Sequence, residues 1–314
     1  MRLQTLVVFL IALVTAAPAG AQDAAPPVLA TIKPVHSLVA AVMEGVGTPA
    51  LLIRGGVSEH SYVLKPSDAQ KIARAKVVFW IGPDLETYLT APLASLAGEA
   101  KVVALEDAKA LHRLPARPGG LWTANAPSAG SIIPHTINPH VWLDPQNAVA
   151  MTRTIATVLS KTDPVHAGRY AANARAEIAR LDALDAALEQ TLAAVRTRPY
   201  IVFHDAYQYF EARYRLDAIG AVTVEPDRPV GPRRVAQLRD VLKAGQALCI
   251  FREPQFAPAL IEALAESTKA RIGVLDPLGA DLAPGPDLYP MLMTRLAGAI
   301  VQCLAPSQRQ PRRP

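Results

Sequence analysis

The amino-acid sequence predicts an α/β protein of two lobes, each with a roughly four-stranded parallel sheet flanked by helices, joined by one long rigid helix. Short β-rich runs alternate with helical patterns in both halves of the chain, which is typical of parallel sheets covered by helices. Runs such as Val77 to Ile81 are continuously apolar, as expected of strands buried on both faces. Between the halves, residues 161–198 carry a long helical pattern.

The N-terminal lobe is expected over residues 22–160. Gly55 and Gly56 end its second strand, and Pro66 suits the first turn of the helix that follows. Asp144 can cap a later helix whose first turn contains Pro145. We expect strands over 28–33, 51–54, 77–81 and 101–105, and helices over 37–43, 66–75, 84–96 and 147–159.

Residues 111–138 interrupt this alternation. Prolines and glycines recur through the segment, and no strand or helix pattern continues across it. Long irregular loops inside a compact domain are often functional lids or simply mobile, and both interpretations apply here.

The connecting helix is expected over residues 161–198. Asp163 and Pro164 form a cap-plus-proline start, and Gly168 is the only glycine or proline from there to Val195. Apolar residues recur at helical spacing: Ile178, Leu181, Leu184, Leu188, Leu192 and Val195. A helix from 164 to 195 would be roughly 48 Å long, enough to run along both lobes as a single rigid connector.

The C-terminal lobe is expected over residues 199–306, followed by a disordered tail over 307–314. Pro199 ends the long helix, and Gly245 ends a later one. We expect strands over 200–203, 218–224, 248–251 and 272–275, and helices over 206–214, 232–243, 258–269 and 289–304.

Residues 1–21 read as a cleavable signal peptide. Arg2 supplies a positive start, Leu6 to Val14 is apolar but short for a membrane span, and Ala19-Gly20-Ala21 fits a cleavage site. We expect an exported periplasmic protein that does not itself span a membrane. The alternative is an uncleaved N-terminal anchor.

The composition and charge argue against two classes of protein. Hydrophobic residues make up 51% of the chain and charged residues 19%, which excludes a disordered protein. The formal charge is +5, but the basic residues are scattered and do not alternate with aromatic residues. A nucleic-acid partner is therefore not expected.

Cys249 and Cys303 are the only cysteines. In an oxidising compartment an even number favours a disulfide, which would tie the last helix to a core strand. A disulfide that closes the chain between residues 249 and 303 would raise the free energy of unfolding by about 4 kcal/mol, as an upper-end estimate. The alternative is a pair of buried free thiols.

Three histidines are candidate metal ligands: His60, His140 and His204. Each lies in a loop or extended segment next to a strand or helix end, and the carboxyl ends of parallel strands are where α/β folds place ligands. Three imidazoles suit zinc. Taken alone, their spacing is also compatible with unrelated surface or capping histidines.

Three carboxylates accompany these histidines. Glu59 adjoins His60, Asp205 adjoins His204, and Asp276 follows the strand expected over 272–275. Each is either a fourth ligand or a partner that orients an imidazole. Capping of a helix or turn is the alternative for Asp205 and Asp276.

Five ordered motifs carry a family resemblance. They are EHSYVLKPSD (59–68), VVFWIGP (77–83), PHVWLDP (139–145), VFHDAYQYF (202–210) and LDPLG (275–279). The chain resembles, over about residues 28–304, the metal-binding cluster A-I (cluster 9) of ABC-transporter substrate-binding proteins, most closely the periplasmic zinc-uptake proteins of the ZnuA type. The resemblance implies two lobes joined by a long helix, with His60, His140 and His204 as ligands and a Cys249–Cys303 disulfide.

The third histidine bears on the choice of metal. Manganese-binding relatives typically have a carboxylate where this chain has His204, and Mn²⁺ prefers oxygen donors, so zinc is favoured. For the fourth position we prefer Glu59 or water, with Asp276 close behind. Zinc-specific relatives often carry a loop rich in His and acids, but residues 111–138 hold only His112 and His135 and no Asp or Glu. His135 is either a transient ligand or an exposed residue without function.

The function expected is a monomeric, non-enzymatic zinc-binding protein that delivers Zn²⁺ to an ABC permease in the inner membrane. A manganese- or iron-binding protein of the same family is the first alternative. Another is an exported zinc hydrolase with Glu59 as general base, although no HExxH motif is present. An adhesin with structural zinc is a further alternative.

Overall fold

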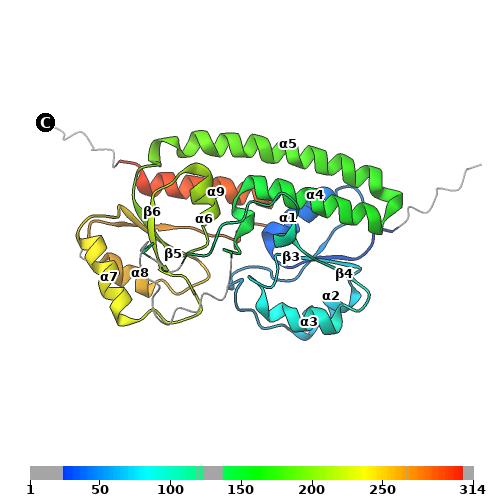
Figure 1. Cartoon of the computed structure of the whole chain (residues 1–314), viewed down its shortest axis with the longest axis horizontal. Coiled ribbons are helices and arrows are strands. Elements are labelled where there is room, and N and C mark those ends of the chain that lie inside the picture. Colours follow the sequence, from blue (N-terminus) through cyan, green and yellow to red (C-terminus); the bar gives the residue numbers. More distant parts are fainter. Residues whose placement is uncertain (1–23, 118, 120, 123–136, 267, 307–314) are drawn as a thin grey trace, which may run out of the picture.

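Two parallel four-stranded sheets form the two lobes of the computed structural model, which describes residues 24–117, 119, 121–122, 137–266 and 268–306 (Figure 1). The first sheet has the order β2-β1-β3-β4 and the second has the order β6-β5-β7-β8. The first contains β1 (Val28–Ala30), β2 (Ala50–Leu51), β3 (Val77–Trp80) and β4 (Lys101–Ala104). The second contains β5 (Tyr200–His204), β6 (Ala218–Thr223), β7 (Cys249–Arg252) and β8 (Arg271–Val274). The predicted fold class is confirmed.

The central strands are the continuously apolar ones. In β3, Val77, Val78 and Phe79 are fully buried, and β3 pairs in parallel with β1 on one side and β4 on the other. In β5, Tyr200 and Ile201 are equally buried, between β6 and β7. Helices cover these strands, so polar side chains would have no water to contact.

The helices mostly follow the predicted ranges. They are α1 (Lys33–Val42), α2 (Pro66–Arg74), α3 (Thr90–Leu96), α4 (Pro145–Thr162), α6 (Gln208–Tyr214), α7 (Pro232–Lys243), α8 (Ala259–Ala265) and α9 (Leu288–Leu304). The helix expected from residue 84 is a correction: a turn and a 3₁₀ turn (Thr87–Leu89) come first, and α3 begins at Thr90. Pro92 then falls in the first turn, where its missing N–H costs nothing.

The long helix α5 (Ala167–Leu192) runs along both lobes (Figure 1). Short 3₁₀ turns, Pro164–His166 and Ala193–Val195, extend it at each end. It begins later than expected because α4 continues to Thr162 and the chain turns at Asp163, whose carboxylate accepts hydrogen bonds from His166 and Tyr170. Its buried residues include Tyr170, Leu181 and Leu188.

Two loops also cross between the lobes. Before the gap at 123–136, Leu114 donates its backbone N–H to Tyr209 of α6, and Pro115 accepts a hydrogen bond from Gln208. In the opposite direction, the loop after β8 reaches the first lobe, where Trp142 donates to the carbonyl oxygen of Pro277. These crossings, together with α5, restrict how far the lobes can separate.

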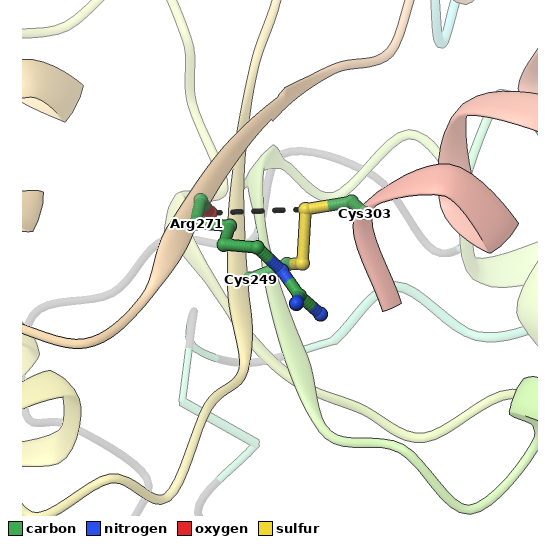
Figure 2. Close-up of a disulfide and its surroundings, with 3 residues drawn as sticks. All are labelled: Cys249, Arg271 and Cys303. Carbon is green, nitrogen blue, oxygen red and sulfur yellow. Dashed lines mark hydrogen bonds between the residues drawn. A yellow bond between two sulfur atoms is a disulfide. The ribbon is translucent and has the colours of Figure 1, made fainter. Parts of the chain in front are cut away.

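The disulfide joins Cys249 of β7 to Cys303 of α9 (Figure 2), so the prediction of a bridge is confirmed. The two Cα atoms are 6.2 Å apart. The sulfur of Cys303 also lies 3.8 Å from the carbonyl oxygen of Arg271 on β8. The bridge therefore fixes the last helix to β7, a central strand of the second sheet.

Several expectations lie outside the described residues: the signal peptide over 1–21, the tail over 307–314 and His135. Among the helices that the structure does describe, none combines the length and the apolar character needed to cross a membrane.

Replacing Cys249 and Cys303 together by serine should lower the free energy of unfolding by about 2–4 kcal/mol, because the unfolded chain loses its cross-link. Denaturant unfolding without reductant measures the loss. Added reductant should destabilise the wild-type protein similarly and leave the variant unchanged. Equal stability of the two proteins would contradict this account.

Candidate metal centre

Four side chains converge between the lobes: Glu59, His60, His140 and His204. Each offers one ligand atom, and these atoms all lie within 4.8 Å of one another. Glu59 and His60 lie in the loop between β2 and α2, and His140 immediately precedes a 3₁₀ turn (Val141–Leu143) that leads into α4. His204 is the last residue of β5.

The three imidazoles present their Nε2 atoms to a common point. The Nε2 atom of His140 lies 3.1 Å from that of His60 and 3.2 Å from that of His204. In a tetrahedral zinc site with Zn–N distances of 2.0–2.1 Å, two nitrogen ligands are about 3.3–3.4 Å apart. The spacing of the rings therefore fits a single small metal ion.

Glu59 completes the donor set. It is fully buried, and both carboxylate oxygens lack a hydrogen-bond partner among the described residues. Its Oε1 atom lies 3.7 Å from Nε2 of His140 and 3.8 Å from Nε2 of His204. A buried carboxylate without hydrogen bonds is costly unless a cation compensates it. This carboxylate is therefore well suited to bind a metal.

Asn138 orients His140. Its side-chain oxygen accepts hydrogen bonds from the backbone N–H and from Nδ1–H of His140, at 3.1 and 2.8 Å, while its Nδ2 donates to the carbonyl oxygen of Asp205. Because Nδ1 carries the proton, Nε2 keeps its lone pair for the metal. Asn138 thus connects His140 of the first lobe to Asp205, the residue that follows His204 in the second lobe.

Glu253 orients His204 in the same way. Its carboxylate accepts a hydrogen bond from Nδ1 of His204, at 2.8 Å to Oε1 and 2.7 Å to Oε2. Burial lowers the pKa of His204, but the charges of Glu253 and Glu59 outweigh it and raise this pKa to about 9. The sequence reasoning missed Glu253, although it follows the end of β7 just as His204 ends the adjacent β5.

The chain matches a known family over residues 28–303, described as "Zinc-uptake complex component A periplasmic". The chain belongs to this family. The High-affinity zinc uptake system protein ZnuA of Brucella suis is 44% identical over 305 residues, which cover 88% of this chain and 91% of the relative.

Solved structures agree with the zinc-uptake family fold. A ZnuA deletion mutant with zinc bound has a TM-score of 0.75 and 26% identity, covering 91% of this chain and 100% of that chain. FpvC from Pseudomonas aeruginosa in complex with Mn²⁺ has a TM-score of 0.74 and 22% identity, covering 89% of this chain and 98% of that chain. This likeness to FpvC concerns the fold alone, so the fold does not decide the metal.

Two predicted carboxylates lie outside the four-residue group. Asp205 pairs instead with Arg117, at 3.0 Å. Asp276 caps a turn: Oδ1 accepts from Gln255 and from the backbone N–H groups of Leu278 and Gly279, and Oδ2 accepts from that of Ala280. Asp276 therefore has the turn-capping role that was the alternative to metal binding. The geometry favours Glu59 as the fourth donor.

The other described histidines have structural contacts. His36 lies 3.1 Å from the carbonyl oxygen of Pro49, and His166 pairs with Asp163. His112 donates its backbone N–H to Asn147, and its ring lies 3.9 Å from the carboxylate of Asp144. An aromatic side chain borders the centre: the Trp142 ring lies 5.3 Å from the ring of His140 and is fully buried. A dry wall of this kind strengthens the electrostatic attraction between a cation and its ligands.

The Glu59→Gln variant, free of metal, should become more stable than the metal-free wild-type protein as the pH rises. Burial raises the pKa of Glu59 from 4.5 to about 7, so the folded state favours the protonated form. The resulting stability is complete below pH 4.5 and is lost as the pH rises through 7, by about 3 kcal/mol. The variant should lack this loss.

Unfolding of chelator-treated protein at pH 5, 6, 7 and 8 measures the effect. Exposed Glu99, replaced by glutamine, is the matched control and should retain the wild-type pH dependence. Parallel pH profiles for wild type and the Glu59 variant would show that Glu59 is not buried as a carboxylate.

Proposed function

We propose that this protein is the high-affinity zinc-binding component of a periplasmic uptake system, which delivers Zn²⁺ to an ABC permease in the inner membrane. The observation that carries the proposal is the group of three imidazoles and one carboxylate, in which Glu59, His140 and His204 are buried and His60 is partly buried. Membership of the zinc-uptake family and the zinc-bound ZnuA relative support it.

Binding in this site requires no covalent step. Asn138 and Glu253 hold the rings of His140 and His204 with Nε2 toward the ion, so little orientational freedom is lost when the ion enters. Glu59 supplies a negative charge in a site where water cannot screen it. We therefore assign the protein a binding role and not a catalytic one.

The donor set favours zinc over the alternative of manganese or iron. Three nitrogen donors and one carboxylate oxygen match four-coordinate zinc, whereas Mn²⁺ is better served by oxygen-rich sites. The hydrolase alternative is weaker, because a catalytic zinc keeps an open position and the fourth place is assigned to Glu59 in this proposal. Water as the fourth ligand is correspondingly disfavoured.

The remaining assignments belong to the same proposal. The protein acts in the periplasm after removal of residues 1–21, as a monomer whose lobes cover 22–160 and 199–306 with the connecting helix between them. Its metal ligands are His60, His140, His204 and Glu59. The permease partner follows from the role of such binding components in uptake systems.

Replacing His140 by alanine should weaken zinc binding by more than about 100-fold, since loss of a ligand costs more than loss of an outer partner. Calorimetry at neutral pH, with a competing chelator, measures the affinity and the 1:1 stoichiometry. His166→Ala, remote from the centre and paired with Asp163, is the control and should bind like wild type. Unchanged binding by the His140 variant would remove the site assignment.

Zinc affinity should rise with pH up to about 9, because His204 holds a proton below its raised pKa of about 9. Below pH 7, Glu59, with a pKa of about 7, adds a second proton to be displaced. Calorimetry in buffers of different ionisation enthalpy counts the protons released per zinc. Release of no proton at pH 6.5 would contradict this assignment.

A further inference from the structure

A second carboxylate lies near the centre but is already committed to other bonds. Asp276 lies two residues after the end of β8, at the same carboxyl edge of the sheet as His204, the last residue of β5. Burial raises the pKa of Glu59 at the centre, and the charge of Asp276 adds to that rise. Four hydrogen bonds nevertheless hold its two oxygens, one from Gln255 and three from the backbone of residues 278–280.

Lys33 fixes the loop that makes these bonds. It is the first residue of α1, in the first lobe, and its side chain is almost fully buried. Its ammonium group donates to three carbonyl oxygens of the second lobe, those of Gly279, Ala280 and Leu282, at 2.9, 2.7 and 2.8 Å. With the carbonyls of the turn held by Lys33, the amides of the same turn face Asp276.

Further contacts leave this loop little freedom. Gly55 of the first lobe has φ +108°, and a Cβ atom there would lie 3.0 Å from the end of the Lys33 side chain and 3.2 Å from the carbonyl oxygen of Ala280. Trp142 donates to the carbonyl oxygen of Pro277. The loop is therefore held by residues of the first lobe, one of which, Trp142, packs against the ring of His140.

We propose that the Lys33-pinned turn (residues 276–282) determines metal specificity, by keeping the Asp276 carboxylate away from the bound cation. The inference rests on the proposed function, because it concerns which cation the same site prefers. With Asp276 withheld, the ion receives three imidazoles and the carboxylate of Glu59. A second carboxylate would raise the coordination number and the oxygen content, which favours Mn²⁺ more than Zn²⁺.

The test compares Zn²⁺ and Mn²⁺ affinities of the purified protein with those of a Lys33→Met variant, which keeps the length of the side chain and removes the ammonium group. The affinity for Mn²⁺ should rise about tenfold, while the affinity for Zn²⁺ changes less than about threefold. Lys71→Met is the matched control, since Lys71 also donates to a backbone carbonyl, that of Leu51, and lies away from the turn. It should keep the wild-type ratio.

The gain in Mn²⁺ affinity must depend on Asp276. The double variant Lys33→Met/Asp276→Ala should return to the wild-type ratio of affinities. X-ray absorption of the Mn²⁺-loaded Lys33→Met protein should show one more oxygen ligand than the double variant. An unchanged ratio in folded Lys33→Met, or a gain that persists in the double variant, would overturn the proposal.

Two further variants keep the test decisive if Lys33→Met does not fold. Gln255→Leu removes one donor to Asp276 without touching Lys33 and should shift the ratio in the same direction. Asp276→Ala alone should leave zinc affinity within about threefold, whereas a loss of about 100-fold would make Asp276 a zinc ligand and overturn the proposal. Failure of the wild-type protein to bind zinc would instead count against the proposed function.

Discussion

The buried carboxylate of Glu59 is the constraint on which the centre depends. A carboxylate removed from water and without hydrogen bonds is unfavourable unless it is protonated or neutralised by a cation. Three imidazole nitrogens on the same point make that cation a metal rather than an arginine or lysine, because metals accept their lone pairs. The unfavourable metal-free state is therefore part of the driving force for binding.

The partners behind the ligands extend this constraint through both lobes. Asn138 accepts a hydrogen bond from Nδ1–H of His140 and donates to the backbone carbonyl of Asp205, and Glu253 accepts a hydrogen bond from Nδ1–H of His204. Arg117, from the irregular segment of the first lobe, neutralises Asp205 and Glu211 next to the same ligand. The relative position of the lobes and the geometry of the centre are thus determined by one connected set of polar contacts.

The sequence predicted the parts of this arrangement that follow from local rules. Apolar runs located the strands. The rule that ligands gather at the carboxyl ends of parallel strands brought the three histidines into consideration, and Glu59 followed as the neighbour of His60. The same rule could have found Glu253, which directly follows β7. It could not separate Glu59 from Asp276, because the difference lies in hydrogen bonds made by a turn that Lys33 holds from 246 residues away in sequence. The later start of α5 depends on a local side-chain contact between Asp163 and Tyr170 that the apolar spacing does not reveal.

The origin of the four donors bears on how an ion leaves such a site. Glu59, His60 and His140 precede the long helix, and only His204 follows it. A small separation of the lobes therefore removes one nitrogen donor and leaves three donors on the first lobe. His204 then becomes free to bind a proton, which its neighbour Glu253 stabilises. Because loss of a single donor is enough to weaken the site, the rigid connection through α5 and the crossing loops is compatible with release, and wide opening of the lobes is unnecessary.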